Sequence, residues 1–298
     1  MLLEEVSAID AALRKRGREV IVLKGLHLAE EYFGELAARH VADIDILIEG
    51  GQDLRAYEEI LTGLGYFRRS WILGSRAMTA GYTHHLEFDG ARAPLDLHWV
   101  LRQHPSFALD YSEIWRRKRV VNVRQMEHFA LDVEYLLVLE LLSIHTDIQV
   151  GFVRIKSFID VYVILKRVEA TFQWNEFLAR RVEERLLRIS INLIDLVLEV
   201  LDCREEFPNL AEAIARYRRL VLLSDHGSKL DLVLGGGSAF HRRAWALQLY
   251  EISTARAFFW WAIGFPFRVA EHRPIRQSPR PSSYASSAPE VQLPEDLP

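Results

Sequence analysis

The hydrophobic pattern of residues 1–125 alternates between helical and strand-like spacing. Apolar residues recur every three or four positions in three segments that we expect to be helices: 2–17, 26–33 and 54–64. Short apolar or alternating runs, typical of strands, occupy 19–23, 43–48, 82–88, 94–100 and 119–123. Asp89-Gly90 separates two of these strands and is typical of a hairpin turn. The order of elements predicts an α+β unit, a mixed sheet with flanking helices.

After residue 125 the pattern becomes predominantly helical. Apolar residues follow helical spacing in four segments: 131–146, 154–168, 174–184 and 186–201. A further helix is expected from about Ala239. These segments predict a helical bundle. Glycines 235–237 are not followed by the residues of a phosphate-binding loop, so we interpret them as a linker.

The end of the chain differs in composition from both parts. Residues 271–298 hold six of the ten prolines, with serines between them, and are expected to be disordered. We therefore expect an α+β domain over residues 1–125, a helical domain over residues 126–270 and a Pro/Ser-rich tail.

The overall charge limits the class of partner. A net charge of −4 argues against a protein that binds nucleic acid non-specifically, and no DNA partner is expected. The basic run at 116–119 is interpreted as a solvated helix end rather than a phosphate site. Cys203 is the only cysteine, so an intrachain disulfide is excluded, and we expect a buried, inert thiol.

The apolar runs and the N-terminal charges predict the compartment. The chain opens with acidic residues where a signal peptide would carry positive ones, so we expect a cytoplasmic protein. The longest apolar run, residues 257–267, covers 11 residues, whereas a membrane span needs about 20. We expect no membrane span. This aromatic stretch is interpreted as packing core, with an interaction surface as the alternative.

The candidate chemistry begins with two aspartates in one predicted strand. Asp43 and Asp45 share a face because side chains alternate along a strand, while Ile44 and Ile46 face the core. Two neighbouring carboxylates repel each other, and a divalent cation between them relieves the repulsion. A solvated pair on an exposed strand edge is the alternative for such a motif taken alone.

A second predicted strand adds a third carboxylate. Asp96 and His98 share one face of this strand. Three aspartates from two strands of one sheet form a suitable ligand set for a pair of metal ions. Upstream, Lys24-Gly25 joins a strand to a helix, where backbone N–H groups favour phosphate. An ordinary turn with a solvent-facing lysine is the alternative there.

The histidines suggest a different metal. His84, His85, Asp96 and His98 could compose a zinc site. However, His84 and His85 are adjacent and should point to opposite faces of a strand, so at most one should join His98. A histidine that hydrogen-bonds beside the acidic residues is the preferred interpretation. His145 is interpreted as a satisfied core histidine rather than a catalytic base.

Together these motifs resemble the polymerase-beta-like nucleotidyltransferases. More narrowly, VLKGLHLAEEYFGELAARHVADIDILI followed by LDLHWVL is similar to a bacterial nucleotidyltransferase family with the pattern Leu-Lys-Gly, Arg-x-x-x-Asp-Ile-Asp and Asp-Leu-His-Trp. Arg39, Asp43, Asp45, Asp96, His98 and Trp99 fall on this pattern. The resemblance covers roughly residues 15–200 and extends to His145, Lys156 and Asp160 in the helical half.

The resemblance implies a site and a reaction. Asp43, Asp45 and Asp96 would be catalytic and would bind metal, and Lys24, Gly25, Arg39 and Lys156 would bind the nucleotide, although Arg39 is expected to order the loop or pair with an acidic residue. A second tier comprises His98, His85, His145 and Asp160. Residues 1–125 would be the catalytic domain, with the active site between it and the helical domain.

The implied reaction is transfer of a nucleoside monophosphate from an NTP to an acceptor hydroxyl or phosphate, with release of pyrophosphate. The cofactor would be Mg²⁺, with Mn²⁺ as the alternative ion, and the acceptor would be a small molecule, a peptide or a protein. Two other hypotheses stay open: an inactive nucleotide-binding or interaction module, and a toxin-like enzyme that modifies RNA or protein.

Overall fold

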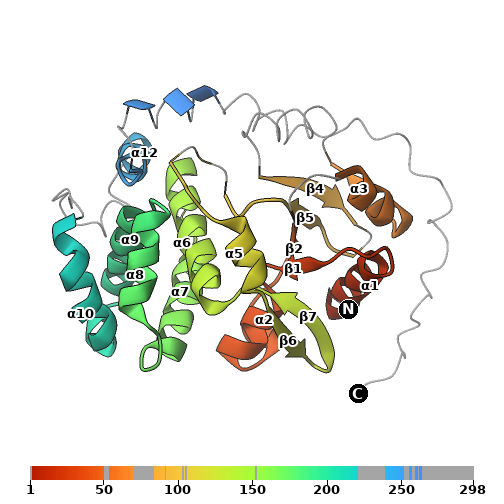
Figure 1. Cartoon of the computed structure of the whole chain (residues 1–298), viewed down its shortest axis with the longest axis horizontal. Helices are drawn as coiled ribbons and strands as arrows, with labels where there is room; N and C mark the ends of the chain where they lie inside the picture. The colour runs from red at the N-terminus through yellow and green to blue at the C-terminus, as the bar shows by residue number, and fades with distance from the viewer. Residues whose placement is uncertain are drawn as a thin grey trace, which may run out of the picture.

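A computed structural model provides the structure of the chain. It describes residues 2–49, 54–69, 84–90, 92–102, 104, 106–151, 153–220 and 239–251, with residues 255, 256, 259, 260, 262 and 263. The predicted linker at 235–237 and the tail at 271–298 lie outside the described residues. A mixed sheet and a helical bundle lie side by side (Figure 1).

Within the described residues, the sheet has seven strands in the order β3-β4-β5-β2-β1-β7-β6. Their bounds are β1 Val20–Val22, β2 Ile44–Ile48, β3 Phe67–Arg68, β4 His85–Asp89, β5 Leu95–His98, β6 Arg119–Val123 and β7 Met126–Ala130. The β2–β5 and β1–β7 pairs are parallel, and the other four are antiparallel. The predicted mixed sheet is confirmed.

Among the described residues, four α-helices, one π-helix and one 3₁₀ turn accompany the strands. They are α1 Leu2–Arg14, α2 Leu26–Leu28, the π-helix η1 Ala29–Phe33, the 3₁₀ turn η2 Leu36–Ala38, α3 Leu54–Gly63 and α5 Tyr111–Arg116. The helix expected over 26–33 is thus split between α and π hydrogen bonding. It ends at Gly34, whose φ of 87° is left-handed.

The second half of the chain forms the bundle. Its elements are α6 Val133–Val150, α7 Ile155–Val168, α8 Trp174–Glu183, α9 Leu187–Val200, η3 Arg204–Glu206, α10 Pro208–Tyr217, η4 Arg218–Leu220 and α12 Ala239–Gln248. The Asp132 side chain caps α6 by accepting a hydrogen bond from the Tyr135 amide. Pro208 begins α10, where its missing N–H costs nothing.

Strand β7 extends the sheet past the boundary expected at residue 125. Ile21 of β1 pairs with Phe129 of β7 in parallel register, and β6 pairs with β7 antiparallel. The segment Met126–Ala130 contains no β-branched residue, which is why its sequence did not predict a strand. Tertiary pairing therefore decides its structure.

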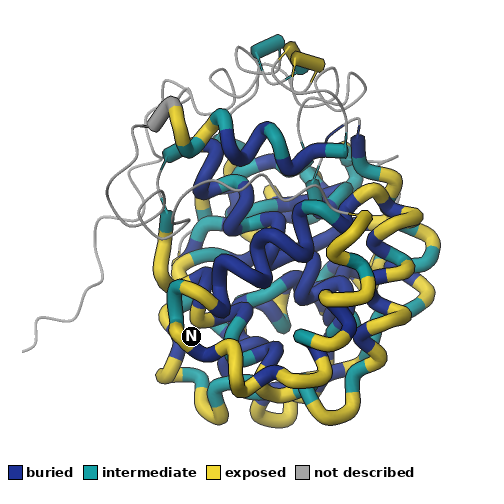
Figure 2. Tube along the Cα trace, turned by 90° about the vertical axis from the view of Figure 1, so that its left-hand side faces the viewer, coloured by how far each residue is buried: buried dark blue, intermediate teal, exposed yellow. Residues whose placement is uncertain are grey.

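The two faces of the sheet pack against different partners. Ile44, Ile46 and Leu97 face a core shared with α1 and α3. Ile21, Leu23 and Leu47 face a larger core shared with the bundle. Nearly all of α6 is buried, and Figure 2 shows dark-blue helices at the centre of the molecule. Within the described part of the chain, no helix combines the length and apolarity needed to cross a membrane.

Candidate active site

The site lies on the face of the sheet that turns toward the bundle. Asp45 of β2 and Asp96 of β5 are directly paired in the parallel ladder, so their side chains project from the same face at the same level. Glu87 of β4 pairs with Asp96 from the other side. Three carboxylates therefore form one row across three strands.

Asp45, Asp96 and His98 form a compact group. One ligand atom from each lies within 4.8 Å of the other two, and His98 Nε2 is 3.2 Å from Asp45 Oδ1. Asp45 is 5% exposed. Asp43 is not part of this group because it precedes the first residue of β2, although its charge contributes to the raised pKa of Asp96.

The predicted phosphate turn meets these carboxylates. Lys24 follows β1, and its Nζ lies 3.5 Å from Asp45 Oδ2. Gly25 has a φ of 95°, and an added Cβ would lie 3.2 Å from Val41 Cγ1. The turn therefore requires glycine for both conformation and space. The Gly25 carbonyl accepts the first helical hydrogen bond, from Ala29.

The two paired aspartates have opposite protonation tendencies. Burial opposes ionisation of Asp45, but the Lys24 ammonium and the hydrogen bond with His98 outweigh it and lower its pKa. Burial raises the pKa of Asp96 to about 7; nearby carboxylates add to the rise and His85 opposes it. One carboxylate is thus firmly ionised while the other can exchange a proton near neutral pH.

The bundle contributes charged groups to the same region. Arg39 donates two hydrogen bonds of 2.8 Å to the Asp160 carboxylate of α7, and both side chains are almost fully buried. The pairing of Arg39 with an acidic residue agrees with the sequence prediction. Partial burial lowers the pKa of Lys156, in the first turn of α7, and the charges of Arg39 and Lys24 add to this effect.

Glu140 was not identified from the sequence. It lies in α6 and is 2% exposed. Burial, aided by Asp160, raises its pKa to about 7 against the opposing charges of Lys24 and Arg39. Its Oε1 has no hydrogen-bond partner among the described residues. The available signal was a single glutamate within the apolar run Val138–Leu142.

The prediction that at most one of His84 and His85 joins His98 is wrong. One ring nitrogen from each of the three histidines lies within 4.8 Å of the other two. The prediction assumed that both residues belong to the strand. Strand β4 begins at His85, so side-chain alternation does not constrain His84.

Other singled-out residues lie elsewhere. His145 is buried and donates from Nε2 to the Ala246 carbonyl of α12 at 2.8 Å, so it belongs to the core. A cavity of about 210 Å³ is lined by residues of α3 and of the segment after α1, and its lining includes none of the site residues.

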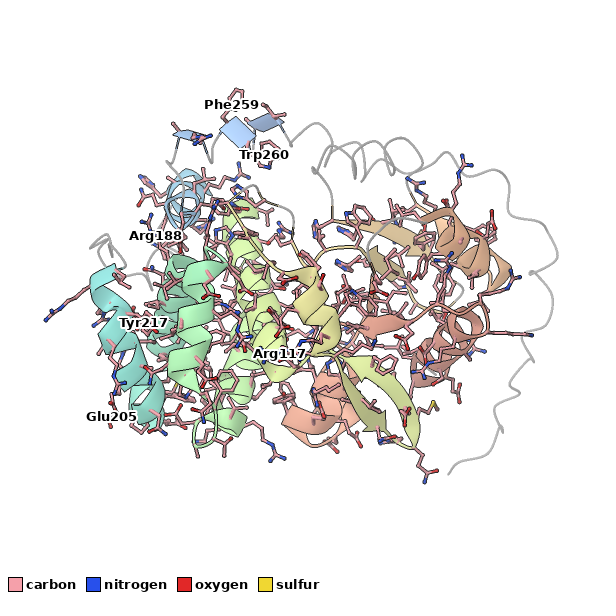
Figure 3. All side chains as sticks on the ribbon, viewed as in Figure 1. Arg117, Arg188, Glu205, Tyr217, Phe259 and Trp260 are labelled. Carbon is pink, nitrogen blue, oxygen red and sulfur yellow. The ribbon has the colours of Figure 1, made fainter. Side chains whose placement is uncertain are left out.

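The basic run at 116–119 is engaged in ion pairs. Arg116 pairs with Glu113, Lys118 with Glu19 and Arg119 with Glu31. Arg117, labelled in Figure 3, pairs with Asp132 and Glu134 at the start of α6. These pairs support the structural interpretation of the run.

The aromatic stretch at 257–267 is described only in part. Phe259 is 66% exposed and, with Trp260, is labelled at the upper edge of Figure 3, beyond α12. Phe259 is therefore not a core residue, in contrast to the packing role preferred for this stretch. The physical reason is that no described element covers it.

The donor set of the site fits a hard divalent cation. The oxygens of Asp45 and Asp96 come from adjacent strands, and Asp43 immediately precedes the first residue of β2. Carboxylate oxygens are the protein ligands that Mg²⁺ prefers. The raised pKa of Asp96 reflects in part the repulsion among these carboxylates, which a bound cation would relieve.

The chain is similar to one protein family and to several solved structures. A sequence model of the family described as "uncharacterised nucleotidyltransferase" matches residues 1–202, which confirms the resemblance drawn from the motifs. No curated protein matches the chain.

Three solved structures are distantly similar. The crystal structure of ANT(2″)-Ia in complex with adenylyl-2″-tobramycin has 13% identity and a TM-score of 0.44, over 62% of this chain and 97% of that one. The solution structure of ANT(2″)-Ia has 10% identity and a TM-score of 0.43, over 74% and 94%. A tRNA-processing enzyme has 12% identity and a TM-score of 0.30, over 90% and 79%.

Proposed function

The chain belongs to the uncharacterised nucleotidyltransferase family, and from this premise we propose that it transfers a nucleoside monophosphate from an NTP to an acceptor hydroxyl or phosphate, releasing pyrophosphate. The observation that carries the proposal is the paired position of Asp45 and Asp96 on adjacent strands, with Lys24 3.5 Å from Asp45. Carboxylates that converge beside a lysine suit phosphoryl transfer, which depends on positioning and charge neutralisation.

Asp43, Asp45 and Asp96 are the residues that would hold Mg²⁺, or Mn²⁺ in its place, in a two-metal arrangement. Such ions, when bound, neutralise the triphosphate and activate the acceptor oxygen. The protein contributes a rigid frame for this chemistry because Asp45 and Asp96 project from paired strands. Asp43, which immediately precedes β2, would complete the set.

The cations around the carboxylates would hold the triphosphate. Lys24 can exchange its contact with Asp45 for a phosphate oxygen, and the left-handed Gly25 lets the chain approach the phosphates closely. Lys156, in the first turn of α7, would add a third contact, because it lies close enough to Lys24 and Arg39 for their charges to interact. Arg39 has a positioning role, since Asp160 occupies its guanidinium.

Asp96 is the group we propose to accept the acceptor's proton. A general base must lie within reach of the proton that it takes, and Asp96 lies beside Asp45 on the adjacent strand, in the same row of carboxylates. Asp45 suits this role less, because Lys24 and His98 lower its pKa and make it a weaker base.

The first experiment measures pyrophosphate release from NTPs with Mg²⁺ or Mn²⁺ and a panel of small-molecule, peptide and protein acceptors. D43N and D45N should each lower the rate by at least about 100-fold, because even the loss of an outer-shell partner costs 10–100-fold. D89N is the matched control, since Asp89 is exposed in β4 of the same sheet, and it should retain full activity. Unchanged transfer in D45N, with its fold verified by circular dichroism, would refute the assignment.

A second experiment separates the enzyme from an inactive binding module. Isothermal titration calorimetry with Mg²⁺-ATP tests nucleotide binding in the wild type and in K24A. Binding that is weakened by K24A and accompanied by pyrophosphate release supports the enzyme. Binding with no release for any nucleotide and acceptor would favour the module instead.

A further inference from the structure

Three histidines converge at the edge of the proposed active site. The ring centroids of His84 and His85 are 4.4 Å apart, those of His85 and His98 are 5.0 Å apart, and those of His84 and His98 are 5.6 Å apart. One ring nitrogen from each lies within 4.8 Å of the other two. We call His84, His85 and His98 the histidine triad.

The backbone explains the convergence. His85 and His98 are directly paired in the antiparallel β4–β5 ladder, so their rings leave the sheet side by side and stack at 22°. His84 immediately precedes β4 and approaches the same two rings from outside the ladder. His85 and His98 therefore lie on paired strands, and His84 lies immediately before β4.

The burial of His98 suits metal binding. His98 is 7% exposed, and its Nδ1 has no hydrogen-bond partner among the described residues. A buried polar nitrogen without a partner is costly, and a bound metal ion would satisfy it. Neutral imidazole is the form of histidine that binds metal.

Nearby charged side chains affect how a metal ion could bind to the histidine triad. Arg102 Nη1 donates to His84 Nε2 at 3.1 Å, so an ion must use the other nitrogen of His84 or displace this guanidinium. His85 Nε2 lies 3.8 Å from Glu87 Oε1, and His98 Nε2 lies 3.2 Å from Asp45 Oδ1. These carboxylates offset the positive charge of an ion and of Arg102.

We propose that the histidine triad is a binding site for a borderline transition-metal ion of the Zn²⁺ or Co²⁺ kind, separate from the carboxylate site for Mg²⁺. Imidazole nitrogens favour these ions, whereas Mg²⁺ favours oxygen ligands. This site goes beyond the proposed transfer reaction and does not depend on it. Because His98 also contacts Asp45, an ion on the triad lies one side chain away from the proposed catalytic carboxylates.

The test is a Co²⁺ titration of the full-length protein followed by its visible d–d absorption, with Zn²⁺ competition as a second readout. The wild type should bind one equivalent with an imidazole-type spectrum, and Zn²⁺ should displace it. H84A and H85A should each weaken binding by at least about tenfold. H241A is the matched control, since His241 is an exposed histidine of α12, and it should bind as the wild type does.

The carboxylate variants separate the two sites. D43N should bind Co²⁺ with unchanged affinity while losing nucleotidyl transfer. If D96N loses Co²⁺ binding while H84A and H85A keep it, the ion occupies the Asp45–Asp96–His98 group and the triad site is refuted. Absence of Co²⁺ binding to the wild type also refutes it. Neither outcome bears on pyrophosphate release, so the two proposals fail separately.

Discussion

His27 shows how a single residue can couple stability to pH. It is fully buried in α2, and neither ring nitrogen has a hydrogen-bond partner among the described residues. Burial lowers its pKa well below the usual 6.5, and positive groups at His128, Arg119 and Arg39 add to the effect. The folded protein therefore keeps this ring neutral, whereas the unfolded chain protonates it below pH 6.5.

The lowered pKa of His27 makes the folded protein less stable at acid pH. Below pH 6.5 the unfolded state binds one more proton at His27 than the folded state, so the free energy of unfolding falls by about 1.4 kcal/mol per pH unit for this group. H27L should remove the contribution of His27 to the pH dependence of the free energy of unfolding. It should cause no loss of stability at pH 8, because it also removes two buried nitrogens that have no hydrogen-bond partner among the described residues. Urea titrations at several pH values measure this.

The control is H40Q, because His40 is exposed; it should leave the pH dependence unchanged. His98 and His145, whose pKa values are lowered to about 4 by burial, should keep H27L partly acid-sensitive. A wild-type slope in H27L would contradict the prediction.

At the scale of elements, the turn between β1 and α2 depends on one glycine. Gly25 has a φ of 95° and faces Val41 at 3.2 Å from the position of an added Cβ. G25A should therefore destabilise the protein by roughly 1–3 kcal/mol and should weaken nucleotide binding, because the turn carries Lys24. Denaturant unfolding and Mg²⁺-ATP calorimetry measure the two effects.

Gly63 provides the matched control for this prediction. It ends α3, its φ is not left-handed, and an added Cβ would meet nothing within 4 Å. G63A should be neutral or should stabilise by up to about 1 kcal/mol, because it restricts the unfolded chain. Equal effects of G25A and G63A would show that the turn tolerates a side chain.

At the scale of the whole molecule, the sheet and the bundle are joined by a buried ion pair as well as by a shared core. Arg39 precedes β2, and Asp160 lies in α7, 121 residues later. Their side chains are 4% and 3% exposed. The pair therefore fixes the bundle against the loop that leads to Asp43.

Breaking this pair should be costly. R39A and D160A should each destabilise the protein by about 3–5 kcal/mol, because each leaves a buried charge without its partner. The double variant R39A/D160A should lose less than the sum of the single variants. E212A, which breaks an exposed ion pair with Arg216 in α10, should change little. Additive losses in the double variant would contradict direct coupling.

Some features of the fold and of the candidate site could be predicted from the sequence, and others could not. The alternation around Asp45 and Asp96 predicted their common face, because side-chain alternation along a strand is a local property. Local spacing likewise placed α6 to α9 within a few residues of their observed bounds. By contrast, β7 and the approach of His84 to His98 were not predicted, because both depend on partners distant in the chain.

The sequence by itself determined the helices α6 to α9, the common face of Asp45 and Asp96 and the family, since these depend on local periodicity and on motif spacing. Only the tertiary structure decided that Asp45 and Asp96 are paired in register, that the buried Glu140 of α6 lies close enough to Asp45 for their charges to interact, and that Asp160 neutralises Arg39. The physical reason is that strand register and helix packing are fixed by burial of the whole core. No short segment contains that information.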